Sequence, residues 1–299
     1  MIPPIIHEIE ARSAINAVQG MPFKWSLNPY KGCVHACSYC YARAYHTFLG
    51  LPVSSFESQI YAKINIAEVL RSELRRGSWT REHIAIGTGT DPYQPFEGQY
   101  RLTRQCLEAM AAFDNPGSVT TKGTLVTRDI DVISDLSSRV DFTVNISLIS
   151  LDRELLRTIE PGTPAPASRL RAIERLSAAG IRVTVFLAPV LPGLTDKPEQ
   201  IEDVVRAAAE YGATDVWAGT LRLAPAIKEH FLQTVQEHFP NLTPAYQRLY
   251  GDGAYTPTAY QLKVEGMVSG RRRAEGLGTR PAAPSAPRVT TRGQLALPI

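Results

Sequence analysis

Three of the four cysteines lie within one eight-residue stretch, Cys33-Val-His-Ala-Cys37-Ser-Tyr-Cys40. Thiolates are the usual ligands of iron–sulfur clusters, which normally take four of them. A set of three leaves one iron without a protein ligand, much as catalytic zinc sites keep one coordination position open. The spacing therefore predicts a soft-metal site that can accept an exogenous ligand.

The same residues allow a second interpretation, a structural zinc ion with His35 or His46 completing a Cys₃His set. Spacing alone leaves both metals open. The fourth cysteine, Cys106, lies in the apolar segment 103–110 and is predicted to be a small buried core residue.

The bulk composition is that of a globular protein, with 44% hydrophobic and 20% charged residues in a chain of 299. The net charge of +3 is too small to indicate nucleic-acid binding by the chain as a whole, although six arginines fall in the last thirty residues. The sequence shows neither a signal-peptide pattern nor an apolar run long enough to span a bilayer. We therefore expect a cytoplasmic protein with reduced cysteines and no membrane partner.

Strand-like and helix-like patterns alternate along the chain. The predicted strands are residues 24–28, 83–86, 118–121, 142–148, 181–187 and 215–221. The predicted helices are residues 64–76, 103–113, 128–136, 167–179 and 196–211, followed by 225–239 and a segment near residue 246. The helix from residue 196 is predicted to begin with a capping box, with Asp196 as N-cap and Glu199 at N3.

Six strand–helix units in a row predict an α/β fold with a parallel sheet, either a partial (β/α)₆ TIM-type barrel or a doubly wound sheet. In both, the functional edge lies at the carboxyl ends of the strands, where the cysteine loop and residues 87–97, 122–124, 147–150 and 189–193 fall. We expect the barrel. Its predicted organisation is a lead-in over residues 1–20, a core barrel with C-terminal helices over 21–255, an extension over 256–275, and a disordered Arg- and Pro-rich tail over 276–299.

The cysteine stretch matches the motif CxxxCxΦC of radical S-adenosylmethionine (SAM) enzymes, including the aromatic Tyr39 before the third cysteine. Further segments resemble the spore photoproduct lyase branch of that superfamily, which is related to DNA repair photolyases. They are Asn28-Pro-Tyr-Lys-Gly32, Tyr41-Ala-Arg43, Gly87-Thr-Gly-Thr-Asp91-Pro, Thr121-Lys122 and Glu160-Pro-Gly-Thr163.

This resemblance implies that Cys33, Cys37 and Cys40 bind a [4Fe-4S] cluster and that SAM chelates its fourth iron. An electron from a donor of the flavodoxin or ferredoxin type would then cleave SAM to a 5′-deoxyadenosyl radical, which abstracts hydrogen from the substrate. The resemblance also implies a set of residues around SAM: Tyr39 near the adenine, Gly87, Thr88, Gly89 and Thr90 at the methionine amino group, Lys122 near the carboxylate, and Ser147 as a further polar candidate.

One departure from the family concerns hydrogen return to the product. Spore photoproduct lyase uses an additional cysteine before the Asp-Pro of the second strand's loop, and residues 87–91 here contain no thiol. Tyr39 and Tyr41 match flanking tyrosines of the family and are the predicted catalytic residues. Asp91 and Glu97 are predicted to contact the substrate. The expected substrate is a nucleic-acid base, with a peptide or a small molecule as the alternative.

The last six residues, Gln294-Leu-Ala-Leu-Pro-Ile299, resemble the peptide with which bacterial repair proteins dock onto the replication sliding clamp. Leu297 and Ile299 would fill an apolar pocket, and Gln294 would fix the register. The arginine-rich segment before them would lie along DNA phosphates, which attract basic chains regardless of sequence.

Overall fold

The computed structural model describes residues 3–278, and their centre is a seven-stranded sheet with the order β10-β9-β8-β7-β6-β3-β2. The six strands from β3 to β10 run parallel, and only β2 pairs antiparallel to its neighbour. The strands are β2 Asn16–Ala17, β3 Trp25–Leu27, β6 Ile84–Ile86, β7 Gly117–Thr121, β8 Phe142–Ser147, β9 Val183–Val190 and β10 Asp215–Thr220. These parallel strands confirm the six that the sequence predicts.

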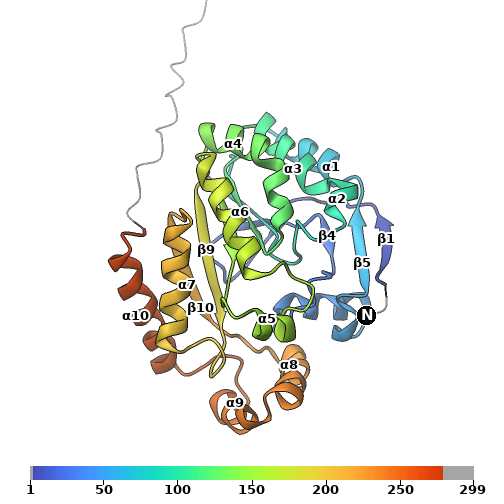
Figure 1. The fold of residues 1–299 in the computed structure, drawn as a ribbon. Coiled ribbons are helices and arrows are strands. Elements are labelled where there is room, and N and C mark those ends of the chain that lie inside the picture. The colour runs from blue at the N-terminus through green and yellow to red at the C-terminus, as the bar shows by residue number, and fades with distance from the viewer. Residues whose placement is uncertain (1–2, 279–299) are drawn as a thin grey trace, which may run out of the picture.

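One face of this sheet is covered by a single layer of helices (Figure 1). They are α1 Ile66–Leu74, α3 Leu102–Ala112, α4 Ile130–Arg139, α6 Pro166–Ala178, α7 Pro198–Glu210 and α10 Thr258–Ala274. Strands that follow one another in the chain are also neighbours in the sheet. A doubly wound sheet reverses its strand order and carries helices on both faces. The chain therefore forms the partial (β/α)₆ barrel.

The two faces of the sheet differ in chemistry. Toward the helices, the strands contribute fully buried apolar side chains such as Ile86, Val119 and Val185 to the main core. On the opposite face, Thr120 of β7 pairs in register with Asn145 of β8, and Phe186 of β9 pairs with Trp217 of β10. The inner face of the barrel thus carries polar and aromatic side chains and is partly open to solvent, and ligand pockets combine aromatic side chains with a few polar groups.

A smaller three-stranded sheet, in the order β1-β5-β4, flanks the barrel. Its strands are β1 Ile5–Ile9, β4 Tyr30–Lys31 and β5 Gln59–Lys63, with β1 parallel and β4 antiparallel to β5. The sequence prediction missed this sheet and treated β1 as part of the lead-in. β4 is only two residues long, and β1 and β5 pair across about fifty residues, so no local pattern marks them.

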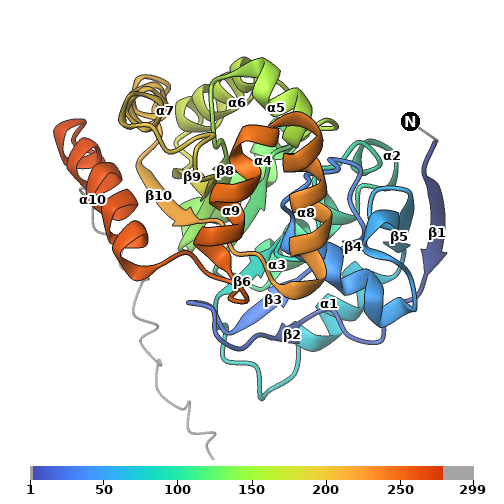
Figure 2. The same ribbon diagram turned by 90° about the horizontal axis from the view of Figure 1, so that it is seen from below.

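The carboxyl edge of the barrel is closed by short helices. In Figure 2 the molecule is seen from below, and α8 (Pro225–His238) and α9 (Thr243–Tyr250) lie in front of the strands. Residues that directly follow β9 and β10, among them Leu191 and Leu221, form a second apolar cluster with Phe231 of α8 and Tyr246 of α9. The elements at this edge include α5 Arg153–Ile159, α8 Pro225–His238, α9 Thr243–Tyr250 and the 3₁₀ helices η1 Tyr41–Leu49, η2 Val53–Ser55 and η4 Pro240–Leu242; α2 Glu97–Tyr100 and η3 Thr124–Asp129 lie in the loops after β6 and β7.

Two predicted boundaries are wrong. The N-cap of α7 is Lys197, whose N–H faces Gln200 Oε1 at 3.4 Å, so the capping box of Asp196 and Glu199 does not form. Asp196 instead accepts hydrogen bonds from Gly193 N–H and the Tyr260 hydroxyl, both at 2.8 Å. Asp196 thus bonds to the preceding turn and to α10 and does not cap the helix.

The second boundary is the start of the tail. Residues 276–278 form a turn rather than disordered chain, because Leu277 is buried and Gly278 N–H donates to Thr214 O at 3.0 Å. Helix α10, which precedes the turn, lies against β10 and α7 at the open edge of the barrel (Figure 1).

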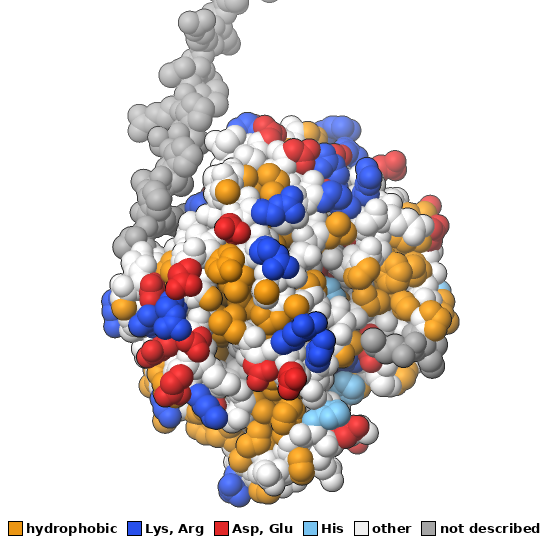
Figure 3. Space-filling model, in the orientation of Figure 1, with side chains coloured by type: hydrophobic (Ala, Val, Ile, Leu, Met, Phe, Trp, Pro, Cys, Tyr) orange, Lys and Arg blue, Asp and Glu red, His pale blue; other side chains and the backbone are white. Residues whose placement is uncertain are grey.

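The surface carries both signs of charge. On the face drawn in Figure 3, basic and acidic side chains are interspersed with apolar ones. Among residues 3–278, no helix is long and apolar enough to cross a membrane.

Candidate functional site

The cysteine loop is fixed by backbone hydrogen bonds to segments that are distant in sequence. Cys33 N–H donates to Phe56 O at 2.9 Å, Ser38 N–H donates to Ile159 O at 2.9 Å, and His35 O accepts from Gly162 N–H at 3.1 Å. Within the loop, Ala36 adopts a φ of +55°, a conformation that costs a non-glycine residue about 1 kcal/mol. The surrounding contacts therefore impose the shape of the loop.

Side chains from the loop after β6 hold the entry to the cysteine loop. Gln94, which is fully buried, accepts from Val34 N–H at 3.2 Å and donates to Gly32 O at 3.3 Å. The Thr90 hydroxyl donates to the same Gly32 oxygen at 2.6 Å. Sequence reasoning missed Gln94, although a glutamine three residues after the Gly87-Thr-Gly-Thr-Asp91 segment is a signal that could have been followed.

Arg43 fixes the middle of the cysteine loop. Its guanidinium is buried, donates to Cys37 O at 2.8 Å and pairs with Glu57 at 2.5 Å. The resemblance had included Arg43 in a motif without assigning it a role. In the structure, Arg43 fixes the carbonyl of Cys37, the central cysteine of the loop.

The three thiols lie near enough to act electrostatically on one another. Cys33 and Cys37 are buried, and Cys40 is partly exposed. Burial raises the pKa of Cys37 to about 12 and also raises the pKa of Cys33. Since burial disfavours the bare thiolates, a cation that binds them contributes the compensating charge.

Both histidines of the zinc interpretation already have partners at Nδ1. His35 Nδ1 lies 3.1 Å from Asp91 Oδ2, and His46 Nδ1 lies 3.0 Å from Ser55 Oγ. Within residues 3–278, no three histidine, cysteine or carboxylate side chains are arranged to hold one metal ion. A cluster has a different requirement, because it spreads its thiolates over separate irons.

A buried ion network lies close to Cys37. Glu160, at the end of α5, accepts from the Tyr39 hydroxyl and pairs with Arg169 of α6 at 2.5 Å, and Lys122 Nζ lies 4.0 Å from its other oxygen. Burial alone would raise the pKa of Glu160, but Arg169 and Lys122 outweigh it and hold that pKa below its usual range. Lys122 Nζ also lies 5.7 Å from the centre of the Tyr39 ring. Two predicted SAM-site residues, Tyr39 and Lys122, thus share one network, while Arg169 was missed.

The glycine loop after β6 is shaped for close approach. Gly87 has a φ of +87°, and a Cβ there would lie 2.5 Å from Thr120 O. Asn28 accepts from Gly89 N–H at 2.7 Å and donates to Thr88 Oγ1 at 3.2 Å. Asn28 therefore fixes the conformation of the glycine loop at the carboxyl edge of the barrel.

Asp91 and Glu97, the predicted substrate residues, both lie in buried networks. Asp91 accepts from Thr121 Oγ1 at 2.5 Å and from Lys122 N–H at 2.7 Å, and another close neighbour is His35 Nδ1 at 3.1 Å. Glu97 is fully buried; its hydrogen-bond partners are Tyr30, Thr103, Arg104 and Arg128. These contacts account for both carboxylates without a substrate, so their role toward one stays a prediction.

The remaining predicted residues lie in different surroundings. Tyr41 opens η1, is 41% exposed, and donates from its hydroxyl to Thr88 O, which joins the cysteine loop to the glycine loop. Ser147 ends β8 and is buried, and its carbonyl accepts from Arg169 at 3.0 Å. Gln294, Leu297 and Ile299 lie outside the described residues, so clamp docking stays a prediction.

We expect Gly162→Ala to distort the cysteine loop. A Cβ at this position would lie 2.0 Å from Val34 O, a contact that only backbone movement can relieve. The substitution should lower the free energy of unfolding by about 1–3 kcal/mol in denaturant titration and reduce the iron retained after desalting. Gly266→Ala is the matched control: it lies in α10 with no atom within 4 Å and should stabilise the helix by up to about 1 kcal/mol. Equal behaviour of the two variants would contradict the anchoring of the loop by Gly162.

A family model, described as the radical SAM superfamily, matches residues 27–208. The matched segment begins at β3 and includes the cysteine loop, the glycine loop and the Glu160 network. The chain belongs to the radical SAM superfamily.

Relatives of this radical SAM protein are found in bacteria and archaea. An uncharacterized protein of Mycobacterium tuberculosis is 41% identical over 267 residues, which cover 88% of this chain and 78% of the relative. An uncharacterized protein of Methanocaldococcus jannaschii is 29% identical over 191 residues, 64% of this chain and 70% of the relative.

The same fold occurs in solved structures of spore photoproduct lyase. A mutant of that enzyme with bound AdoMet and dinucleoside spore photoproduct matches with a TM-score of 0.66 and 17% identity, over 90% of this chain and 79% of the other. A second mutant with the dinucleoside photoproduct matches with a TM-score of 0.67 and 16% identity over the same shares. At this identity the match shows that this radical SAM protein and spore photoproduct lyase share their fold.

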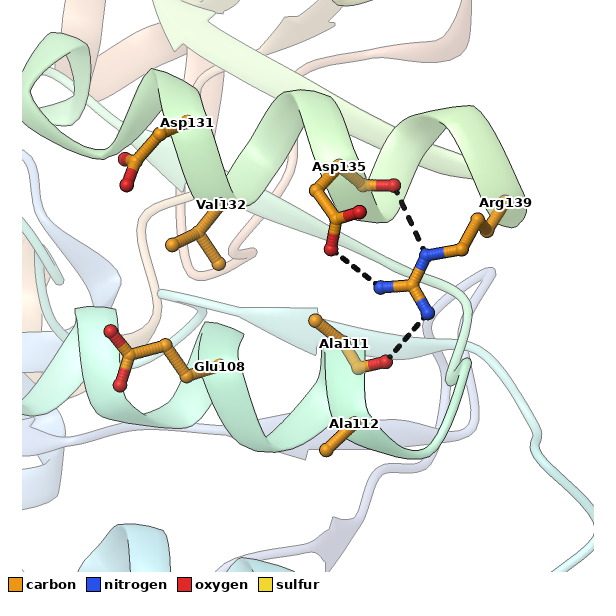
Figure 4. A pocket seen from close by; sticks show the side chains of 7 residues that line it. All are labelled: Glu108, Ala111, Ala112, Asp131, Val132, Asp135 and Arg139. Atoms are coloured by element: carbon orange, nitrogen blue, oxygen red, sulfur yellow. Dashed lines mark hydrogen bonds and ion pairs between the residues drawn. The ribbon is translucent and has the colours of Figure 1, made fainter.

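A hollow of about 480 Å³ between α3 and α4 lies apart from this site. Figure 4 shows the residues that line it. Among them, Arg139 of α4 donates to Asp135 of the same helix and to Ala111 O of α3. Helices α3 and α4 stand at the end of the molecule opposite to α8 and α9 (Figure 1). The site of this radical SAM protein is therefore defined by the loops at the carboxyl edge.

Proposed function

We propose that this chain is an enzyme that holds a [4Fe-4S] cluster through Cys33, Cys37 and Cys40 and cleaves SAM reductively to act on a nucleic-acid base. The observation that carries the proposal is the placement of three thiols on one fixed loop, joined through Tyr41 and Thr88 to the glycine loop at the carboxyl edge of a radical SAM barrel. The donor set suits the cluster, since three thiolates leave one iron for an exogenous ligand.

When bound, the cluster and SAM together supply a 5′-deoxyadenosyl radical that abstracts hydrogen from the substrate. The protein's own part is to bind and orient. Gly87 and Gly89 let the loop pass close to Thr120 and to the Tyr45 ring, and the backbone of this loop would meet the amino acid end of SAM. Lys122, held beside Glu160, offers a positive charge to the SAM carboxylate, and the Tyr39 ring offers an apolar face beside it.

Exclusion of water follows from the packing around the loop. Cys37 and Tyr39 belong to the apolar cluster that α5, α8 and α9 complete. Tyr41, partly exposed next to Cys40, is the residue we propose for hydrogen transfer in place of the thiol that residues 87–91 lack. An electron donor of the flavodoxin or ferredoxin type would supply the electron, and Cys40 is the partly exposed ligand through which it would approach.

A nucleic-acid substrate is favoured over a peptide or a small molecule by the fold. Spore photoproduct lyase, whose structure covers 90% of this chain, is seen with a dinucleoside photoproduct. The missing thiol keeps us from assigning that enzyme's reaction here. The substrate we propose is therefore a base, with the chemical change left to experiment.

Anaerobic purification and reconstitution test the proposal. We expect a brown protein with about four irons per chain that converts SAM to 5′-deoxyadenosine under dithionite. A colourless protein with one zinc ion would contradict the cluster and support the zinc module instead. With a deuterated oligonucleotide, deuterium should appear in 5′-deoxyadenosine; transfer only from a peptide or a small molecule would contradict the nucleic-acid substrate.

A further inference from the structure

We propose that Tyr45, Arg222 and Tyr255 form a platform that stacks one unpaired nucleobase at the carboxyl edge of the barrel. We refer to these three residues as the stacking rim. The inference rests on the proposed function and names the state of the base that the enzyme accepts.

The rim begins next to the cysteine loop. Tyr45 is 46% exposed and packs edge-to-face on Tyr41, with ring centres 6.4 Å apart. Its ring also covers the glycine loop, because a Cβ on Gly89 would lie 2.9 Å from the Tyr45 Cε2 atom. Tyr45 lies in η1, which directly follows Cys40 and packs against α8, and α8 begins three residues after Arg222. The helix η1 therefore connects the cysteine loop with the surroundings of Arg222.

The second part of the stacking rim is Arg222, whose guanidinium lies over the ring of Tyr255. Arg222 is the second residue after β10, and its guanidinium lies 5.3 Å from the centre of the Tyr255 ring. The Arg222 Nε also donates to the Tyr255 hydroxyl at 2.9 Å. Arg222 is exposed, and Tyr255 is 60% exposed. A planar cation and an aromatic ring thus lie side by side, both exposed to solvent.

The backbone behind Tyr255 is fixed although its ring is not buried. Leu223 N–H donates to Ala254 O at 2.8 Å, and Lys228 Nζ donates to Gly251 O at 2.9 Å and to Gly253 O at 2.6 Å. On the other side, the buried Thr256 bonds to Thr220 at 3.2 Å. The backbone on both sides of Tyr255 is thus held in place, while its ring stays largely exposed. Such presentation is what a binding residue requires.

The chemistry of the rim suits a nucleobase. Bases stack on tyrosine rings and on guanidinium planes, and an arginine beside them also pairs with a phosphate. A base inside a duplex has both faces covered by its neighbours, so only a single-stranded or flipped base can use such a surface. The inner face of the barrel also carries Thr120 and Asn145, which are polar groups of the kind that read base edges.

The test is oligonucleotide binding by the anaerobically reconstituted protein, followed by fluorescence anisotropy. The probes are a labelled single strand of about 12 nucleotides, the same strand in a duplex, and the same strand with abasic positions at its centre. We expect the single strand to bind most tightly. Tyr255→Ala should weaken its binding on the order of 10-fold, while Tyr255→Phe, which keeps the ring, should retain most of the affinity.

Arg222→Lys separates stacking from charge, because it keeps the charge and loses the planar face. We expect it to weaken binding to the single strand more than binding to the abasic strand. Ile5→Ala is the control, since Ile5 is 55% exposed on β1, far along the chain from the rim. Circular dichroism identifies any variant that has not folded, in which case Tyr255→Phe and Arg222→Lys carry the test.

The possible failures are distinguishable. If the wild type binds the single strand and Tyr255→Ala binds it equally well, the stacking rim is wrong and the nucleic-acid function stands. Equal affinity for the single strand, the duplex and the abasic strand also overturns the rim. A wild type that binds none of the three probes, or that binds an aromatic peptide instead, overturns both the rim and the nucleic-acid substrate.

Discussion

Replacing Cys37 by alanine is expected to abolish iron binding and SAM cleavage. Cys37 is the central thiol of the loop, is buried, and has its carbonyl fixed by Arg43. A cluster left with two thiolates loses half of its usual complement of four, and Fe–S clusters depend on these ligands. The measurement is iron and sulfide per chain after anaerobic reconstitution, together with 5′-deoxyadenosine formed under dithionite, which should fall to background.

Cys106→Ala is the matched control for this loss. Cys106 is equally buried, but it lies in α3 among apolar side chains of the main core. We expect the variant to keep its iron and its SAM cleavage and to lose about 1 kcal/mol of unfolding free energy, from the small cavity that remains. If Cys37→Ala retained iron at the wild-type level, this result would contradict the assignment of the cluster to this loop.

Arg169→Met should be the most destabilising single change in the ion network under the cysteine loop. The Arg169 side chain is fully buried and donates to Pro164 O, Ser147 O, Thr163 and Glu160. Removing it leaves Glu160 as a buried charge without its main partner, which costs about 3–5 kcal/mol. Denaturant titration should show this loss, and the iron content should fall with it, because Glu160 also holds Tyr39.

The double variant Glu160→Gln/Arg169→Met tests the cause. It removes the unpaired charge, so it should recover part of the stability that Arg169→Met loses. Arg206→Met is the control, since Arg206 pairs with Asp203 on the exposed face of α7 and such pairs contribute less than about 1 kcal/mol. A loss below 1 kcal/mol in Arg169→Met would mean that the network does not hold the loop.

The features that could be predicted from the sequence are those with a local pattern. The six parallel strands and their helices follow from periodicity, and the cysteine loop from the CxxxCxxC spacing and its flanking tyrosines. The polar inner face of the barrel is also visible in the alternation of Thr143, Asn145 and Ser147 along β8. A parallel strand buried on both faces would instead be apolar throughout.

The features that could not be predicted depend on partners far apart in the chain. Tyr39 and Glu160 are 121 residues apart, and Gln94 reaches Val34 across 60. Glu97 illustrates the resulting error of interpretation: a carboxylate in a loop near the strand edge suggests a ligand for substrate. Only the fold shows that Tyr30 and Arg128 surround it. Side chains of this kind are positioned by tertiary packing, for which local spacing carries no signal.

The closure of the carboxyl edge by α8 and α9 bears on how the metal centre matures. In the folded chain Cys33 and Cys37 are 7% and 6% exposed, which leaves little access for incoming iron and sulfide. The cluster of apolar side chains over Cys37 and Tyr39 is completed by residues 225–250, which a ribosome synthesises after every barrel strand. If this loop holds the proposed cluster, iron would reach it before these two helices dock or when they are released. Residues 225–250 would then influence when the metal enters, although they supply none of the three thiols.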